Sequence, residues 1–507
     1  MIATVRSATI LGARGHPVSV EVHVAKGIPG FAMLGLPDES CREARDRVRA
    51  AIITSGFAWP DKKITVNLAP PSYRKTGSGL DLPIAIGLLV AFDVIPLDAV
   101  RNLDFVGELG LDGTIRRVPG IAPMVGVFPD DDWIVPADAL REARIVGRGV
   151  IRPIDKLDRL VEALTGAASW PEYDEAAAPV VAEESEAHDM ADVRGQPHAR
   201  NALEVAAAGG HHLLFVGPPG AGKTMLARRL PALLPDLDPG TALETTMIHS
   251  ASGVPLPGGG LVIRPPFRAP HHTSSLPSLV GGGSHALRPG EISLAHGGVL
   301  FMDEMGQFPT KVLDGLREAL ELGRIMVGRV EHERVPMPAR FQLIGATNPC
   351  ACGGGAPGAC ECDEGSRKRY IGRLSGPLLD RFDLRVAVAR PEVEQLFGGD
   401  PGESTAQILP RVVVARRLAL DRGGVLNAAL DEHGLNEFAP LTKAAGDMLY
   451  RELERGRLTA RGLHRVRRVS RTLADLAGES GEIDEKHVIT ALGMRSRIGL
   501  SAVGQAA

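Results

Sequence analysis

An eight-residue glycine-rich segment carries the strongest chemical signal in the sequence. It consists of Gly217, Pro218, Pro219, Gly220, Ala221, Gly222, Lys223 and Thr224, and it fits the pattern GxxxxGK followed by Ser or Thr. In such a loop the backbone N–H groups turn toward phosphate oxygens, the lysine reaches the β and γ phosphates, and the hydroxyl binds Mg²⁺. The apolar run 213–216 before the loop and the helix-forming stretch after it favour this interpretation over a simple tight turn. The expected ligand is ATP with Mg²⁺.

A second apolar stretch ends in two carboxylates, in Gly298-Val-Leu-Phe-Met-Asp303-Glu304. The apolar run predicts a buried parallel strand whose carboxyl end delivers Asp303 to the metal, while Glu304 polarises the attacking water. Alone, such an ending is an ordinary strand terminus. Downstream of a phosphate loop it predicts ATP hydrolysis.

Two more polar positions follow short predicted elements. The buried strand 341–347 ends at Asn348, which is placed to orient a water between the metal site and the γ-phosphate. In segment 375–383, Arg381 lies just past a short helix and can stabilise charge on the phosphate of a neighbouring subunit. Pairing of Arg381 with Asp380 or Asp383 is an equally open interpretation.

Four of the five cysteines crowd into thirteen positions, as Cys350, Cys352, Cys360 and Cys362. Two Cys-x-Cys pairs separated by a glycine-rich loop predict a tetrahedral Zn²⁺ site. Because it lies between Asn348 and Arg381 in the sequence, it would be a structural brace for the ATPase interface and not a catalytic metal. Disulfides and a reduced, metal-free loop are the alternatives. Cys41 is expected to be an unpaired thiol in a helix.

Two segments are rich in Arg and His and are candidates for the lining of a pore. Segment 255–290 contains Arg264, Arg268, His271, His272 and Arg288, and the predicted hairpin 323–340 contains Arg324, Arg329 and Arg334. Each residue alone is best explained as part of a solvated face, but as sets they favour phosphate tracking along DNA. For His271 and His272 a hydrogen-bonded role in the loop is favoured over a metal pair.

Composition and patterning predict three domains in 507 residues. The net charge of −4 argues against a protein that coats nucleic acid by overall basicity. Residues 170–192 contain eight acidic residues and no Lys or Arg, which predicts a solvated linker. The expected boundaries are an α+β domain at 1–168, a linker at 169–191, an α/β core at 192–398 and a helical lid at 399–507. The apolar run 82–92 is too short to span a bilayer, and the N-terminus does not resemble a signal peptide. The expected location is a reducing cytoplasm.

In order and spelling, these motifs resemble AAA+ ATPases of the magnesium-chelatase-like ComM/YifB family. The marks are FRAPHHTSS (267–275), RPGEISLAHGGVLFMDE (288–304), ATNPCAC (346–352), SGPLLDRFD (375–383) and TARGLHRVRRVSRTLADL (459–476). The resemblance implies a P-loop core with Asn348 as sensor 1, Arg381 as the trans-acting finger and Arg461 as sensor 2. Arg465 and Arg468, on the same helical face as Arg461, are expected only to be solvated. The resemblance further implies a homo-hexamer that migrates DNA branches in recombination and natural transformation, acting on branched or single-stranded DNA. The alternative is a motor for metal insertion into a tetrapyrrole.

The first domain resembles the Lon-protease-like fold in segments 75–91 and 106–124. Proteolysis of that type needs a Ser nucleophile and a Lys base. The expected Ser position holds Gly79 or Leu80, and the expected Lys position holds Ala122. Ser78 and Lys75 lie nearby but are not expected to form a dyad. We therefore expect a scaffold without a protease substrate.

Overall fold

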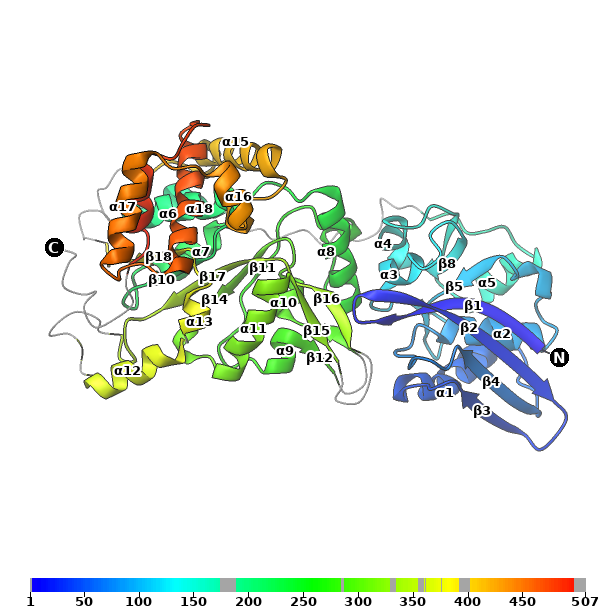
Figure 1. The fold of residues 1–507 in the computed structure, drawn as a ribbon. Coiled ribbons are helices and arrows are strands. Elements are labelled where there is room, and N and C mark those ends of the chain that lie inside the picture. The colour runs from blue at the N-terminus through cyan, green and yellow to red at the C-terminus, as the bar shows by residue number, and fades with distance from the viewer. Residues whose placement is uncertain are drawn as a thin grey trace.

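The computed structural model describes residues 2–173, 188–283, 287–328, 334–353, 360, 362–374, 376–391 and 402–496. Arg329, most of the expected acidic linker (174–187) and the end of the expected lid (497–507) lie outside these residues. Two β-sheets and a helical bundle organise the chain, as Figure 1 shows. Within the described residues, no helix combines the length and apolarity needed to cross a membrane.

The first sheet has seven strands in the order β3-β4-β2-β1-β5-β8-β9. Its strands are β1 (Ile2–Leu11), β2 (Arg14–Ala25), β3 (Gly30–Leu34), β4 (Lys63–Ala69), β5 (Leu103–Phe105), β8 (Asp132–Pro136) and β9 (Ile151–Ile154). The helices beside them are α1 (Glu39–Thr54), α2 (Asp81–Ala91), α3 (Ile121–Val125), α4 (Leu140–Arg144) and α5 (Leu157–Thr165). Every residue of α2 is buried, so the apolar run 82–92 is a core helix. Strands and helices are both present in this part of the chain, as the α+β expectation required.

Lys75 and Ser78 of this first part have separate partners. The Lys75 ammonium donates to the carbonyl oxygens of Pro70 and Tyr73. The Ser78 hydroxyl donates to the carboxylate of Glu108. Cys41 lies in α1 as expected, where burial raises the pKa of its thiol.

The second sheet is parallel throughout, with the order β11-β14-β17-β10-β18. Its strands are β10 (Leu213–Val216), β11 (Phe267–Arg268), β14 (Val299–Met302), β17 (Gln342–Thr347) and β18 (Leu384–Ala387). The surrounding helices are α6 (Pro197–Gly209), α7 (Lys223–Arg229), α8 (Pro239–Ser252), α9 (Leu276–Val280), α10 (Glu291–Leu294), α11 (Thr310–Leu322), α12 (Glu364–Arg373) and α13 (Gly376–Leu379). The strands β14 and β17 are buried along their whole length, which explains their apolar runs.

Two small pairings project from this core. β12 (Gly281–Gly282) pairs with β13 (Arg288–Pro289), and β15 (Arg324–Val327) pairs with β16 (Val335–Pro338). The second pairing confirms the predicted hairpin.

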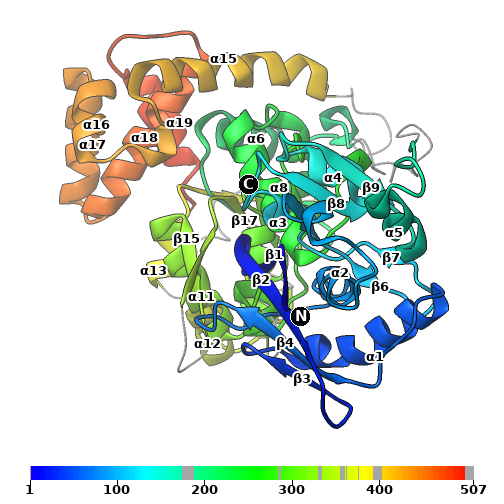
Figure 2. The ribbon, with the colours of Figure 1, turned by 90° about the vertical axis from the view of Figure 1, so that its right-hand side faces the viewer.

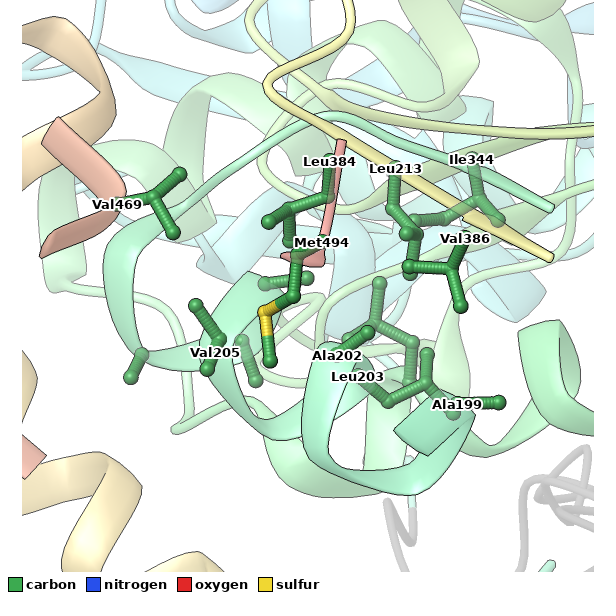
Figure 3. Close-up of a cluster of buried hydrophobic side chains, with 14 of the residues drawn as sticks. Ala199, Ala202, Leu203, Val205, Leu213, Ile344, Leu384, Val386, Val469 and Met494 are labelled. Carbon is green, nitrogen blue, oxygen red and sulfur yellow. The ribbon is translucent and has the colours of Figure 1, made fainter. Parts of the chain in front are cut away.

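The C-terminal helices share a hydrophobic core with the parallel sheet. They are α15 (Thr405–Gly423), α16 (Glu432–Phe438), α17 (Lys443–Glu454), α18 (Ala460–Leu476) and α19 (Glu485–Gly493). Figure 3 shows Val469 of α18 near side chains of α6, with Leu213 and Leu384 of the sheet close by. This bundle is therefore packed on the core.

The first part of the chain contacts the parallel core through α8. Figures 1 and 2 both show α8 beside α3. The Gly120 N–H donates to the Ser250 carbonyl over 2.8 Å, and the Ser250 hydroxyl donates to buried Glu142 over 2.6 Å. The turn between β1 and β2 meets the hairpin as well, because a Cβ on Gly12 would lie 2.9 Å from Met337. These contacts tie the two sheets together.

Candidate nucleotide-binding site

The glycine-rich loop joins the end of β10 to the start of α7. A Cβ on Gly217 would lie 2.1 Å from the Val388 carbonyl oxygen, so only glycine fits against β18. Gly220 and Gly222 have φ angles of +78° and +86°, which other residues rarely adopt. The backbone can therefore curl around an anion at the N-terminus of α7.

The Lys223 side chain folds back over this loop. Its ammonium donates to the carbonyls of Gly217 (2.7 Å) and Pro218 (2.9 Å) and to Asn348 Oδ1 (3.0 Å). Burial lowers the pKa of Lys223. Asn348 follows the end of β17, which lies between β14 and β10, so the sheet order itself brings the amide to the lysine.

The two predicted metal ligands lie side by side. The Thr224 hydroxyl donates to Asp303 Oδ2 over 2.6 Å, and the other Asp303 oxygen accepts from the Glu304 N–H over 2.8 Å. A hydroxyl and a carboxylate at this separation are hard oxygen donors that fit two adjacent positions of Mg²⁺. The Glu304 carboxylate is directed elsewhere, with Oε2 3.4 Å from His272 Nδ1.

The four clustered cysteines lie next to the same loop. Cys350 Sγ is 3.3 Å from Cys352 Sγ and 3.4 Å from Cys360 Sγ, and Cys352 and Cys360 are 3.5 Å apart. With Cys362, all four sulfurs lie within 4.8 Å of one another. A tetrahedral zinc with Zn–S bonds of about 2.3 Å needs sulfurs about 3.8 Å apart, so these thiols fit that ion. A Cβ on Gly353 would lie 2.7 Å from Pro219, so the cysteine loop packs on the phosphate loop.

Arg381 lies at the other edge of the sheet. It precedes β18, whereas the phosphate loop follows β10, and these parallel neighbours are paired in register from Leu213 with Leu384 to Val216 with Ala387. Four residues of strand span about 13 Å, so Arg381 is well separated from Lys223 of its own chain. Arg381 pairs with Glu321 of α11.

The interpretation that Arg381 pairs with Asp380 or Asp383 is therefore wrong, because both acids have other partners. Asp380 lies 3.6 Å from Arg385, and Asp383 binds Arg465 and His211. Asp383 is buried, which disfavours its charge, but the contacts with His211 and Arg465 hold its pKa well below the usual range. The carboxylate that pairs with Arg381 is therefore Glu321, which comes from a different helix, α11.

The lid arginines also differ from expectation. Arg465 is nearly buried against Asp383, and Arg468 donates to the Leu430 carbonyl over 2.8 Å, so neither is merely solvated. The reason is that this face of α18 packs on the core. Arg461, one turn before Arg465, is exposed, and its charge adds to the burial that lowers the pKa of Arg381. Arg461 therefore lies on the Arg381 side of the sheet.

The basic residues of segments 255–290 and 323–340 fall into two groups, those paired with other side chains and those that are exposed. Arg268 makes two hydrogen bonds to Glu291 and is committed to that pair. The rings of His271 and His272 are tilted by 34° with their centroids 4.1 Å apart, but their Nδ1 atoms face Thr273 and Glu304 respectively. Arg264, Arg288, Arg324 and Arg334 are exposed, and so is Arg340 at the end of the hairpin, which lies 3.5 Å from Glu244.

Sequence reasoning missed three contacts of this region: His272 with Glu304, Glu321 with Arg381, and Arg465 with Asp383. Each joins residues from different elements, so no local pattern marks it. The only indication in the sequence was that His271 and His272 lie in FRAPHHTSS (267–275), one of the motifs that carry the family resemblance.

A phosphate loop, a strand ending in Asp-Glu and a neighbouring strand ending in Asn define a P-loop nucleotide-binding core of the AAA+ type. Three family models match the chain: "Subunit ChlI of Mg-chelatase" at 20–138, "Magnesium chelatase, subunit ChlI" at 189–396, and its C-terminal part at 402–495.

Two named proteins are similar to the chain over most of its length, and a third over about a third of it. Competence protein ComM of Haemophilus influenzae is 40% identical over 509 residues, which is 98% of each chain. YifB of Escherichia coli, described as uncharacterized, is 40% identical over 98% of this chain and 97% of its own. The magnesium-chelatase 38 kDa subunit of Rhodobacter capsulatus is 29% identical over 35% of this chain and 49% of its own. The chain belongs to the magnesium-chelatase-like ComM/YifB family.

Proposed function

We propose that this protein is an ATP-driven motor whose hydrolysis sites close between adjacent subunits of a ring. One observation carries the proposal: Lys223 and Arg381 lie at opposite edges of one parallel sheet. A phosphate held over Lys223 is out of reach of Arg381 in the same chain. In a ring of subunits, which the family resemblance implies is a hexamer, Arg381 of one subunit can lie beside Lys223 of the next.

The residues then divide the work. Backbone N–H groups of the phosphate loop and Lys223 bind the triphosphate, and Thr224 with Asp303 would hold Mg²⁺. Held there, Mg²⁺ would neutralise charge on the phosphate oxygens. Glu304 orients and deprotonates water, and Asn348 fixes Lys223 and the water position. Arg381, with Arg461 beside it, stabilises the charge that develops on the phosphate of the adjoining subunit.

For the substrate we propose DNA, with branch migration as the activity. The support is twofold. A relative covering 98% of the chain is named a competence protein. Segment 255–290 exposes Arg264 and Arg288, and the hairpin exposes Arg324 and Arg334, which suits contact with phosphates. In this view, recombination and natural transformation are the pathways served.

A chelatase motor that drives metal insertion into a tetrapyrrole is the second candidate. It is favoured by the magnesium-chelatase names of the three family matches. Against it, the named chelatase subunit aligns with only 35% of this chain.

The deciding experiment measures ATP turnover with and without a four-way DNA junction, together with junction dissociation. We expect stimulation by the junction and strand products that require ATP. Glu304→Gln should bind ATP and the junction but release no phosphate. A turnover unaffected by DNA, with no junction dissociated, would exclude the DNA assignment.

We also propose that Cys350, Cys352, Cys360 and Cys362 bind one structural Zn²⁺, in keeping with a reducing cytoplasm. Metal analysis of the purified protein should find about one zinc per chain. The double variant Cys350→Ser with Cys362→Ser should lose it, while Cys41→Ser, far along the chain in α1, should keep it. Equal zinc in all three proteins would remove the proposal.

For residues 1–168 we propose a Lon-protease-like scaffold without proteolytic activity, followed by a linker at 169–191, the core at 192–398 and the lid at 399–507. The separate partners of Lys75 and Ser78 support this role. Incubation with unfolded protein and ATP should yield no cleavage products.

A further inference from the structure

We propose that Tyr370 is a positioning residue that holds Asn348 in the orientation needed to fix the attacking water. The inference rests on the proposed function, because it takes Asn348 as the residue that fixes the water position. It adds a residue of α12 that belongs to none of the nucleotide-binding motifs and acts only through Asn348.

Asn348 lies where the restraint from the sheet ends. The parallel pairing of β17 with β10 runs as far as Thr347 with Val216, so Asn348 lies one residue past the paired part of its strand. Its side-chain oxygen accepts from Lys223 over 3.0 Å. When ATP binds, Lys223 has to reach the β and γ phosphates, so the ligand competes for this ammonium. A restraint that is independent of the ligand must therefore come from another element.

Tyr370 of α12 contacts the chain at this point. Its hydroxyl oxygen lies 3.3 Å from Thr347 Oγ1, and the Thr347 hydroxyl also donates to the Asn348 carbonyl over 3.2 Å. Burial raises the pKa of Tyr370, and hydrogen bonds with Thr347 and with the backbone of Asn348 partly offset the rise. The phenol therefore contacts both residues at the end of β17.

The ring that carries this hydroxyl is itself held in place. Only 7% of Tyr370 is exposed, and a Cβ on Gly306 would lie 2.6 Å from Tyr370 Cζ. About one turn later in α12, Arg373 donates to the Gly306 carbonyl over 3.4 Å. Two side chains of α12 therefore grip the short turn after β14. A phenol fixed in this way can transmit the position of α12 to Asn348.

The cysteine cluster explains how a later helix reaches the end of β17. Cys350 follows Asn348 by two residues, and Cys362 precedes the first residue of α12, Glu364, by two. Because the four sulfurs lie within 4.8 Å of one another, the chain returns to the ATP site where α12 begins. Tyr370 is six residues into this helix, a rise of about 9 Å. The four thiols thus place the helix whose tyrosine contacts the Asn348 backbone.

The test measures steady-state ATP turnover of the full-length chain and its affinity for a fluorescent ATP analogue. Tyr370→Phe keeps the ring against Gly306 and removes only the hydroxyl. We expect kcat to fall about fivefold at unchanged KM and unchanged Kd for the analogue, equivalent to one net hydrogen bond of about 1 kcal/mol. The matched control is Tyr450→Phe, at a tyrosine of α17 that is 62% exposed, and it should leave kcat unchanged.

A second pair of variants separates positioning from a purely structural role. In the Asn348→Ala background, Tyr370→Phe should cause no further fall in kcat, because no amide remains to be positioned. A further fivefold fall in that background overturns the route through Asn348. An unchanged kcat of Tyr370→Phe in the otherwise wild-type chain, with an unchanged melting transition, overturns the proposal altogether.

Should Tyr370→Phe fail to fold, Thr347→Val removes the other side of the contact and is judged by the same two criteria. Failure of the proposed function has a different signature. Undiminished turnover of Glu304→Gln or of Asn348→Ala would refute the roles given to those residues, whatever the result for Tyr370→Phe.

Discussion

The carboxyl ends and the amino ends of the parallel strands, here called the carboxyl edge and the amino edge of the sheet, carry sites of opposite character. At the carboxyl edge, a backbone loop, Lys223 and the oxygens of Thr224 and Asp303 surround a space suited to a metal-bound anion. At the amino edge, Arg465 pairs with buried Asp383, Arg381 pairs with Glu321, and Arg461 is exposed. The proposed hydrolysis needs an added positive charge at the first edge, and Arg381 and Arg461 at the second edge could supply it to an adjoining subunit. Under this proposal, one chain holds both halves of a site that it does not close alone.

The largest expected effect separates binding from hydrolysis. Lys223→Ala should abolish ATP binding, because the ammonium that contacts the phosphates is lost. Arg381→Ala should bind ATP normally yet lose turnover by about a thousandfold or more, as expected for an arginine finger. Fluorescent-nucleotide titration and phosphate release measure the two quantities. Loss of ATP binding in Arg381→Ala would place both residues at one edge and break the comparison.

The amino edge should also matter more for stability. Asp383→Asn leaves Arg465 nearly buried without its counter-charge, so we expect the free energy of unfolding to fall by about 3 kcal/mol. Asp380→Asn is the matched control, since its partly exposed pair with Arg385 should contribute less than about 1 kcal/mol. Denaturant titrations of both variants measure the difference. Equal losses would mean that Asp383 has no special structural role.

Low pH should lower the stability of the fold at the amino edge through protonation of His212. This imidazole accepts from the Leu343 N–H on Nδ1 (3.0 Å), and burial lowers its pKa from 6.5 to about 4. The unfolded chain binds this proton near pH 6.5 and the folded chain only near pH 4. Stability should therefore decrease by about 3 kcal/mol as the pH falls across that window.

The variant His212→Gln keeps an acceptor for Leu343 but does not titrate. Melting curves between pH 4 and 7 should show a shallower pH dependence for it than for the wild-type chain. Parallel pH profiles would show that His212 is not the group responsible.

The smallest expected effect concerns the carboxyl edge alone. Gly353 has a φ of +77°, and a Cβ there would lie 2.7 Å from Pro219 of the phosphate loop. Gly353→Ala should therefore raise the Kd for ATP about tenfold, by straining the loop. Gly372→Ala, where a Cβ meets nothing within 4 Å, should leave the Kd unchanged. An unchanged Kd in both would uncouple the cysteine loop from the ATP site.

The two edges also differ in what the sequence alone could predict. The carboxyl edge depends on contiguous motifs, so Lys223, Thr224 and Asp303 were expected at one site, and the structure brings them together. The packing of the cysteine loop on the phosphate loop was not expected. The amino edge depends on pairs such as Arg465 with Asp383, which are 82 positions apart. Charge and spacing do not specify such partners. Only the packing of α18 on the core selects them, which is why the same helix face was wrongly expected to be solvated.

Subunit mixing tests the closing of sites between copies most directly. Lys223→Ala supplies an intact amino edge, and Arg381→Ala supplies an intact carboxyl edge. Mixed in equal amounts under conditions that allow exchange, they should recover up to about a quarter of wild-type turnover, because one random interface in about four pairs two intact edges. Each variant alone should remain inactive. A mixture as inactive as its components, after subunit exchange has been verified, would contradict the central claim.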